Sequence, residues 1–290
     1  MYHTTPMDEV QKLYPDDFPP LLREINDAPP YLYMRGSLPK PGAKYLTVVG
    51  SRSMSQYGKD ACEYLISGLA GYPISIVSGL ALGMDGCAHR AALKNGLHTV
   101  ALPGSGINDD VLYPHTHKAL AKQILSAGGA LLSEFEPDHR TMIHYFPQRN
   151  RIMAGMSDAV LVIEAGVRSG TLITARLATE YNRTLLVVPH SIFSDGGAGG
   201  HIFAKIGAQP VRTASDILEA LDVTPESSGI ETVLLTDDER AVLECLSEPM
   251  ARDEIIRQLN MRTGDANVLF AQMEIRGLIA ESLGHVRKLI

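Results

Sequence analysis

Residues 146–180 read FPQRNRIMAGMSDAVLVIEAGVRSGTLITARLATE, and this stretch predicts the fold. Its middle, DAVLVIE at 158–164, is a short apolar run rich in β-branched residues, as expected for a parallel strand covered on both faces. The loop GVRSGT follows at 166–171, and residues 172–181 continue as a helix. The first free N–H groups and the positive dipole end of that helix face the loop, so a phosphate group would bind well there.

Length and composition bound the class of protein. With 290 residues, of which 45% are hydrophobic and 20% charged, the chain can form one α/β core and a small additional domain. It has no uncharged apolar run of about 18 residues and no secretion signal, so we expect a cytoplasmic protein without a membrane partner. Cys62, Cys87 and Cys245 are spread too widely for metal-ligand spacing, and we expect neither a metal nor a cofactor.

The net charge of −7 restricts any nucleic-acid site. Proteins that bind nucleic acid without sequence preference are usually basic overall, and this chain is acidic. A site for a polyanion must therefore be a local patch of positive charge.

We predict four parts along the chain. Residues 1–44 are rich in proline and tyrosine, which indicates an extended lead-in packed on the core, with a short helix near 21–25. In 45–223, β-branched runs alternate with helical patterns, which is typical of βα units and a mostly parallel sheet. The predicted strands are 45–49, 74–77, 99–102, 130–133, 159–163, 184–188 and one near Val211; the clearest helices are 57–70, 85–94 and 172–181.

The remaining two parts are a linker at 224–235 and a small domain at 236–290. The linker begins TPESSGIET, a composition rich in proline, serine and glycine. Helical patterns at 237–246, 252–259 and 267–276 precede a hairpin turned at 283–284, which predicts a winged helix. Its helix at 263–276 carries Asp265 and Glu274 against Arg276, so we expect a protein or intramolecular contact instead of duplex reading.

The first βα junction, VVGSRSMSQYG, is a candidate phosphate site. Gly50 lets the backbone turn off the strand, and Ser51, Arg52 and Ser53 place donors where the next helix begins. It is not a dinucleotide fingerprint, because GxGxxG is absent. Taken alone, the motif is also explained by a tight turn with a serine cap and a surface ion pair, which is the commoner finding.

Two further junctions carry polar side chains. Asp85 and His89 lie four residues apart on one helix face, which fits an acid/base pair or half of a metal site. We favour a simpler account, in which Asp85 caps the helix and His89 lies on its surface. Arg90 is a candidate contact to a polyanion backbone, and Tyr113, in a loop after LPGSG, is a candidate for stacking on a base.

The remaining candidates lie at FPQRNR and in a glycine-rich segment. Arg149 and Arg151 are two apart on a helix, so one faces a ligand or solvent while the other is held by structure. Phe146 is a stacking platform or a core residue. Residues 194–208, SDGGAGGHIFAKIGA, are expected to form a mobile loop in which Lys205 adds positive charge.

Taken in order, GSR…YG, SGLALGMDGCAHRAAL, LLSEFEP, FPQRNRIMAGMSDAVLVIEA, SGTLITARLATEYNR and VVPH resemble the DNA-processing protein A family, DprA or Smf. The similarity covers about 14–223. It implies an extended Rossmann-like three-layer fold, non-catalytic binding of single-stranded DNA, dimerisation, and delivery of the strand to the RecA recombinase during natural transformation. It also implies that a C-terminal winged helix is a common accessory.

By this resemblance, the DNA pocket includes the GSR loop, the FPxRNR residues and the SGTLIT segment at 169–174. The chain departs from the family pattern at Ile143, where many members have a basic residue, and at His190, where most have glycine. Together with the charge argument, the predicted DNA-binding set is Ser51, Arg52, Ser53, Arg90, Phe146, Arg149, Arg151, Ser169, Gly170, Thr171 and Lys205.

An alternative function is that of a phosphoribohydrolase acting on nucleoside monophosphates, from a related Rossmann-like group. Glu134 or Glu164, each at the end of a strand, would then be the catalytic carboxylate. The PGGxGTxxE signature of that group is absent. We therefore predict a DNA-binding protein and no enzyme.

Overall fold

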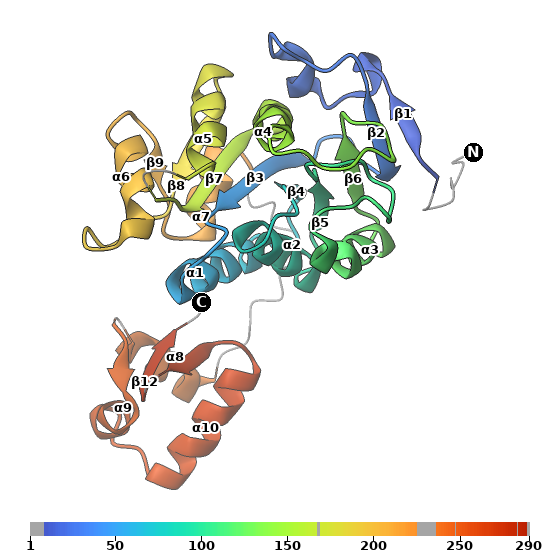
Figure 1. Cartoon of the computed structure of the whole chain (residues 1–290). Helices are drawn as coiled ribbons and strands as arrows, with labels where there is room; N and C mark the ends of the chain where they lie inside the picture. Colours follow the sequence, from blue (N-terminus) through green and yellow to red (C-terminus); the bar gives the residue numbers. More distant parts are fainter. Residues whose placement is uncertain (1–8, 167–168, 225–235, 247, 283, 289–290) are drawn as a thin grey trace. The chain divides into compact units, whose positions relative to one another are not determined.

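A nine-stranded sheet organises the larger part of the chain in the computed structural model (Figure 1). The structure describes residues 9–166, 169–224, 236–246, 248–282 and 284–288. The chain separates into two compact units, Met1–Pro225 and Glu226–Ile290. The predicted linker at 224–235 lies, apart from Thr224, outside the described residues.

The sheet has the strand order β1-β2-β6-β5-β4-β3-β7-β8-β9. The strands from β3 to β9 pair in parallel, while β1 pairs with β2 and β2 with β6 in antiparallel fashion. The strands are β1 Gln11–Leu13, β2 Leu32–Gly36, β3 Lys44–Gly50, β4 Ile74–Ser78, β5 His98–Ala101, β6 Ala130–Ser133, β7 Ala159–Glu164, β8 Thr184–Val187 and β9 Gln209–Pro210.

Helices cover both faces of the sheet, which gives the three layers of an extended Rossmann-like fold (Figure 1). One face packs on α4, α5 and α6, and the other on α1, α2, α3 and α7. Their bounds are α1 Gln56–Ser67, α2 Met84–Lys94, α3 Lys118–Ser126, α4 Tyr145–Met156, α5 Thr171–Glu180, α6 Ala198–Ala204 and α7 Ala214–Ala220. Because both faces are covered, β7 is buried along its whole length, as its apolar run predicts.

The strand order reverses between β3 and β7. From β3 the chain proceeds through β4 and β5 to β6 on one side, whereas β7 returns to the other side of β3 and leads to β8 and β9. In parallel sheets, ligands bind outside the carboxyl ends of the strands at such a switch point. The loops after Gly50 and after Glu164 meet there.

The N-terminal segment extends the sheet, which its sequence did not indicate. Strands β1 and β2 continue the sheet beyond β6. Between them, the short helix η2, Pro20–Glu24, places Leu22 and Ile25 against Gly155 of α4. The segment Leu32–Gly36 contains no β-branched residue, so its local pattern does not indicate a strand and only the pairing with β6 identifies it as one.

The prediction of a mobile loop at 194–208 is wrong for most of the segment. A short helix, η4 (Asp195–Gly197), and then α6 occupy it. A Cβ added to Gly199 would lie 2.7 Å from the carbonyl oxygen of Ala165, so this glycine allows α6 to pack closely on the end of β7. At least one of the glycines that suggested a mobile loop is therefore required for close packing of α6 on β7.

The second unit is a winged helix. The helices α8 (Asp237–Cys245), α9 (Arg252–Gln258) and α10 (Thr263–Ile275) surround a core that includes Val242, Ile255 and Phe270. A three-stranded antiparallel sheet consists of β10 (Met250–Ala251), β12 (His285–Lys288) and β11 (Ile279–Ser282). Within the described part of the chain, no helix has the length and apolar character needed to cross a bilayer.

Candidate functional site

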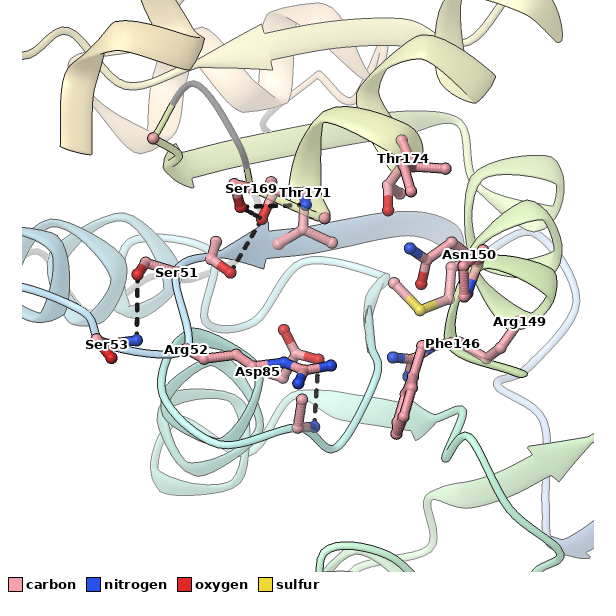
Figure 2. Close-up of a pocket in the computed structure, with 18 residues that line it drawn as sticks. Ser51, Arg52, Ser53, Asp85, Phe146, Arg149, Asn150, Ser169, Thr171 and Thr174 are labelled. Carbon is pink, nitrogen blue, oxygen red and sulfur yellow. Dashed lines mark hydrogen bonds between the residues drawn. The ribbon is translucent and has the colours of Figure 1, made fainter. Parts of the chain in front are cut away.

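A cavity of about 610 Å³ lies where the strand order reverses (Figure 2). The end of β3, the start of α2, the helix α4 and the loop that leads into α5 form its walls. Its polar lining residues among those described are Ser51, Arg52, Ser53, Asp85, Arg149, Asn150, Ser169, Thr171 and Thr174; Phe146, Met153 and Ile173 are among the apolar ones.

Backbone contacts hold the loop that carries Arg52. The carbonyl oxygen of Ser51 accepts a hydrogen bond from the N–H of Met84 at 3.0 Å. Gly83 has a φ of +76°, and a Cβ there would overlap with the carbonyl groups of Ser51 and Arg52. Only glycine therefore satisfies both the backbone conformation and the close approach. The loop is fixed against the start of α2, while the Arg52 side chain remains exposed.

Arg52 reaches across the cavity toward α4 (Figure 2). Its guanidinium carbon lies 5.0 Å from the centre of the Phe146 ring, within the range of a cation–π contact. The ring of Tyr113 is 6.0 Å from that of Phe146. Phe146 is thus only partly buried and lies beside a positive charge at the cavity wall.

The start of α5 is tied to the end of β3. The Thr171 hydroxyl donates to the carbonyl oxygen of Gly50 at 3.1 Å, and the Ser169 hydroxyl donates to the Thr171 hydroxyl at 2.9 Å. The N–H of Thr171 in turn donates to the Ser169 hydroxyl at 3.2 Å. These bonds hold the positive end of the α5 dipole at the cavity.

Arg149 is a buried cation in the cavity wall. Its side chain is 6% exposed, and Nη1 donates to the carbonyl oxygen of Leu102. The guanidinium lies against Gly79, where a Cβ would overlap with it, and among the described residues Nε has no hydrogen-bond partner. Burial lowers the pKa of Arg149 to about 10, an effect that nearby Asp85 opposes, so the side chain stays charged at neutral pH.

Asp85 also lines the cavity, which the sequence analysis missed. It lies in the first turn of α2, as predicted, but is only 8% exposed, and Oδ2 accepts the N–H of Ala81 at 3.2 Å. Burial raises the pKa of this carboxyl, and the charge of Arg149 offsets part of the shift. The glycines after β4 were the available signal, because they place the start of α2 at the same edge of the sheet as Arg52.

The structure places three of the predicted DNA-binding residues outside the cavity wall. Arg151 points from α4 to an ion pair with Glu134 and lies 3.8 Å from Asp27. Arg90 and Lys205 are exposed on α2 and at the end of α6. Arg149 is therefore the arginine of FPQRNR that faces the cavity, and Arg151 is the one held by structure, because residues two apart point in different directions on a helix.

The proposed surface position of His89 is wrong. The side chain is fully buried, and Nδ1 lies 2.8 Å from the Thr99 hydroxyl, which itself donates to the carbonyl oxygen of Ile76. Nδ1–H must therefore be the donor to Thr99. Helix α2 is buried on the side of both Asp85 and His89, because His89 packs against Thr99 of β5 and Asp85 lies in the cavity wall.

Comparison with known families agrees with this geometry. Residues 10–222 match the model of the DNA recombination-mediator protein A family, and residues 231–285 match that of the DprA winged helix domain. The chain belongs to the DprA family. The resemblance inferred from the motifs is confirmed.

Two relatives illustrate the similarity. The chain is 40% identical to protein Smf of Escherichia coli (strain K12) over 220 residues, which are 76% of this chain and 57% of that protein. It is 40% identical to the DNA processing protein DprA of Streptococcus pneumoniae over 203 residues, or 70% of this chain and 71% of the relative. The match thus spans little more than half the length of the Escherichia coli relative.

Solved DprA structures have the same fold. The X-ray structure of DprA from Streptococcus pneumoniae superposes with a TM-score of 0.68 at 38% identity, covering 73% of this chain and 75% of that one. DprA from Helicobacter pylori gives a TM-score of 0.64 at 28% identity, covering 73% and 95%. The latter structure is described as showing a single-stranded DNA binding mode of that protein.

The two departures from the DprA pattern have different surroundings. Ile143 is 87% exposed in the segment before α4 and does not line the cavity. His190 packs edge-on against Tyr57 with ring centres 4.7 Å apart, and its Nε2 lies 3.0 Å from the carbonyl oxygen of Ile163. His190 therefore stabilises the loop after β8 and is not part of the cavity lining.

Glu134 and Glu164, the two candidate catalytic residues of a phosphoribohydrolase, both have structural partners. Glu134 forms the ion pair with Arg151. Glu164 accepts hydrogen bonds from the N–H of Ser55 at 3.0 Å and from its hydroxyl at 3.1 Å, and so anchors the start of α1. Neither glutamate lines the cavity.

Proposed function

We propose that this chain binds single-stranded DNA in the cavity and does not catalyse a reaction on it. The observation that carries the proposal is the convergence of Arg52, Arg149 and the start of α5 on one cavity beside the Phe146 ring. Cationic groups and helix N–H groups bind phosphates, and an aromatic ring accepts any base. An acidic protein can bind a polyanion in this way because the positive charge is local.

A titration with oligo-dT tests the proposal. We expect the cationic groups of the cavity to neutralise one to two phosphates of the strand and to release their counterions, so raising the salt from about 50 to about 200 mM should weaken binding about threefold to sevenfold. A parallel incubation with AMP tests the alternative, since a phosphoribohydrolase would release free adenine. Release of base without oligonucleotide binding would reverse the assignment.

Replacing Arg52 should weaken this binding. Arg52→Ala removes the exposed guanidinium beside Phe146, and we expect a loss of more than about 1 kcal/mol, the usual scale for a hydrogen bond to a charged group. Fluorescence anisotropy with labelled oligo-dT measures the loss. The control is Arg23→Ala, which removes an exposed arginine from η2, outside the cavity lining. Equal affinities of Arg52→Ala and wild type would remove the loop after β3 from the site.

The other predicted DNA contacts have different proposed roles. We place Ser51, Ser53, Ser169, Gly170 and Thr171 at the cavity rim, where their hydroxyl and N–H groups donate hydrogen bonds to the phosphates of the strand. Arg90 and Lys205, being exposed beyond the cavity, would contact only a strand long enough to extend past it. Arg151 contributes indirectly, because its ion pair holds α4 in place.

We further propose that the chain acts as a cytoplasmic homodimer that transfers the strand to a RecA recombinase. The description of the family as recombination mediators supports the transfer. Ile192, Phe193, Ile202 and Ile206 are exposed near α6, and they support dimerisation through the larger unit. Sedimentation velocity tests the dimer, and RecA ATPase activity on DNA coated with single-strand-binding protein tests the transfer. A monomer, or an unchanged ATPase rate, would contradict the respective proposal.

A further inference from the structure

Helix α10 of the winged helix is apolar on two opposite sides. One side is fully buried in the core of the unit and consists of Ala266, Phe270 and Met273. The other side carries an exposed row of small and apolar residues within about 60° of the helix circumference, the α10 stripe: Gly264, Val268, Ala271 and Ile275. A helix that is apolar on two sides is ordinarily buried on both, so we expect this second face to be covered in the assembled protein.

The α10 stripe is unsuited to nucleic acid. Asp265 and Gln272 flank it on one side, and Asn267 and Glu274 flank it on the other. The phosphates of a nucleic acid laid on the stripe would therefore face carboxylates, which carry the same sign of charge. A protein surface fits the stripe better, and the shape of the stripe indicates which surface.

The stripe is complementary to a second copy of itself when two α10 helices pack antiparallel. In this arrangement Ile275 of one copy would lie opposite Gly264 of the second, and Val268 would lie opposite Ala271. Large residues that face small ones allow two helices to interdigitate closely. A parallel pair would place Ile275 opposite Ile275 and Gly264 opposite Gly264, which crowds one end of the contact and leaves the other end empty.

The flanking side chains agree with the antiparallel arrangement. Asp265 of each copy would lie near Gln272 of the other, and Asn267 would lie near Glu274 on the opposite side. Each of these pairs joins a carboxylate acceptor to an amide donor. The two Asp265 carboxylates would be separated by about nine residues along the helix axis, roughly 13 Å, which exceeds the screening length at ordinary ionic strength.

We propose that the α10 stripe is a contact between two copies of this chain, which pair through their winged helices with α10 antiparallel. The contact is separate from the dimer proposed through the larger unit and does not depend on DNA binding. One helix face per copy buries less surface than the roughly 1,200 Å² of a stable interface, so the pairing is weak and depends on protein concentration. Where copies also dimerise through the larger unit, the two contacts together produce assemblies larger than a dimer.

Disulfide trapping in the full chain tests the arrangement. Copies with Gly264→Cys and copies with Ile275→Cys, both also carrying Cys245→Ser, are mixed and oxidised with copper phenanthroline; Cys62 and Cys87 are buried. An added Cβ at Gly264 meets nothing within 4 Å, and Ile275 is 87% exposed, so both variants should fold. The mixture should form a cross-linked dimer. Neither variant alone should do so, because equal positions lie roughly 16 Å apart in the antiparallel pair.

Three results of this experiment would overturn the proposal. Cross-linking of Ile275→Cys alone would indicate a parallel pair. The absence of cross-linking in the mixture, even at high protein concentration, would assign the stripe to a different occupant. The control is Glu244→Cys, at an exposed position of α8 outside the stripe. If it cross-links with Gly264→Cys as efficiently as Ile275→Cys does, the disulfides reflect random collision.

Sedimentation velocity over a range of concentrations tests the contact without added cysteines. Ile275→Glu would press a charge against Gly264 of the second copy and remove its water, so the concentration-dependent association should weaken at least about tenfold. Ile143→Glu is the matched control, because Ile143 is also 87% exposed but belongs to the larger unit. Its association should equal that of wild type. The proposal fails if Ile275→Glu associates like wild type, or if Ile143→Glu shows the same loss.

Discussion

One methyl group at Gly79 is expected to weaken binding of oligo-dT by about 2 kcal/mol, or about thirtyfold in Kd, while the fold persists. The Cβ of Gly79→Ala would occupy the place of the Arg149 guanidinium, which would have to leave the carbonyl oxygen of Leu102. Because the obstructed group is the end of a flexible side chain, the backbone need not move. Fluorescence anisotropy measures the affinity, and circular dichroism checks the fold.

A double-mutant cycle shows whether the effect passes through Arg149. Once Arg149→Met has removed the guanidinium, Gly79→Ala should cause little further loss of affinity. Gly200→Ala in α6 is the control, because its Cβ would meet the nearest atom at an ordinary 3.8 Å. Additive losses at the two positions would contradict the proposed link.

Acidification from pH 7.5 to pH 5 is expected to cost the larger unit about 2 kcal/mol through His89, given an unfolded pKa of about 6.5. Burial lowers the pKa of His89 to about 3 in the folded protein, and the nearby His117 adds to this effect. Between these two pKa values the unfolded chain binds a proton that the folded chain does not. The stability from His89 is therefore complete above pH 6.5 and decreases as the pH falls.

Urea unfolding at both pH values, followed by circular dichroism, measures this loss. His89→Asn keeps a donor near Thr99 but does not titrate, so the variant should lose about 2 kcal/mol less than wild type on acidification. The control is His115→Asn, since His115 is exposed and should leave the pH dependence unchanged. The same loss in wild type and His89→Asn would assign the acid sensitivity to other groups.

Local sequence patterns predicted most of the central sheet. The predicted strands at 45–49, 74–77, 130–133 and 159–163 lie within one residue of β3, β4, β6 and β7, because each is a short, mostly apolar run bounded by turn residues. Strand β2 was missed because it is defined by its pairing with β6. The glycines at 194–208 indicated mobility, whereas Gly199 serves close packing of α6.

The sequence predicted part of the site, because its motifs name residues but do not show how the folded chain covers them. The motifs identified Arg52, Phe146 and Arg149, and the structure brings all three to one cavity. The sequence favoured a surface position for His89 and a simple cap for Asp85, because a spacing of four shows that two residues share a helix face but does not show what covers that face. Here the covered face is the one that adjoins the cavity and the sheet.

By itself, the sequence determined the order of the central strands from β3 to β8, the family and the residue types available to a ligand, since these follow from local propensity and motif. The tertiary structure alone decided which residues meet. The reversal of strand order at β3 and β7 brings residues more than a hundred positions apart to one edge, as in the hydrogen bond from Thr171 to Gly50. It also turned Arg149 inward and Arg151 toward Glu134, because only the packing of α4 on the sheet determines which side of that helix faces the cavity.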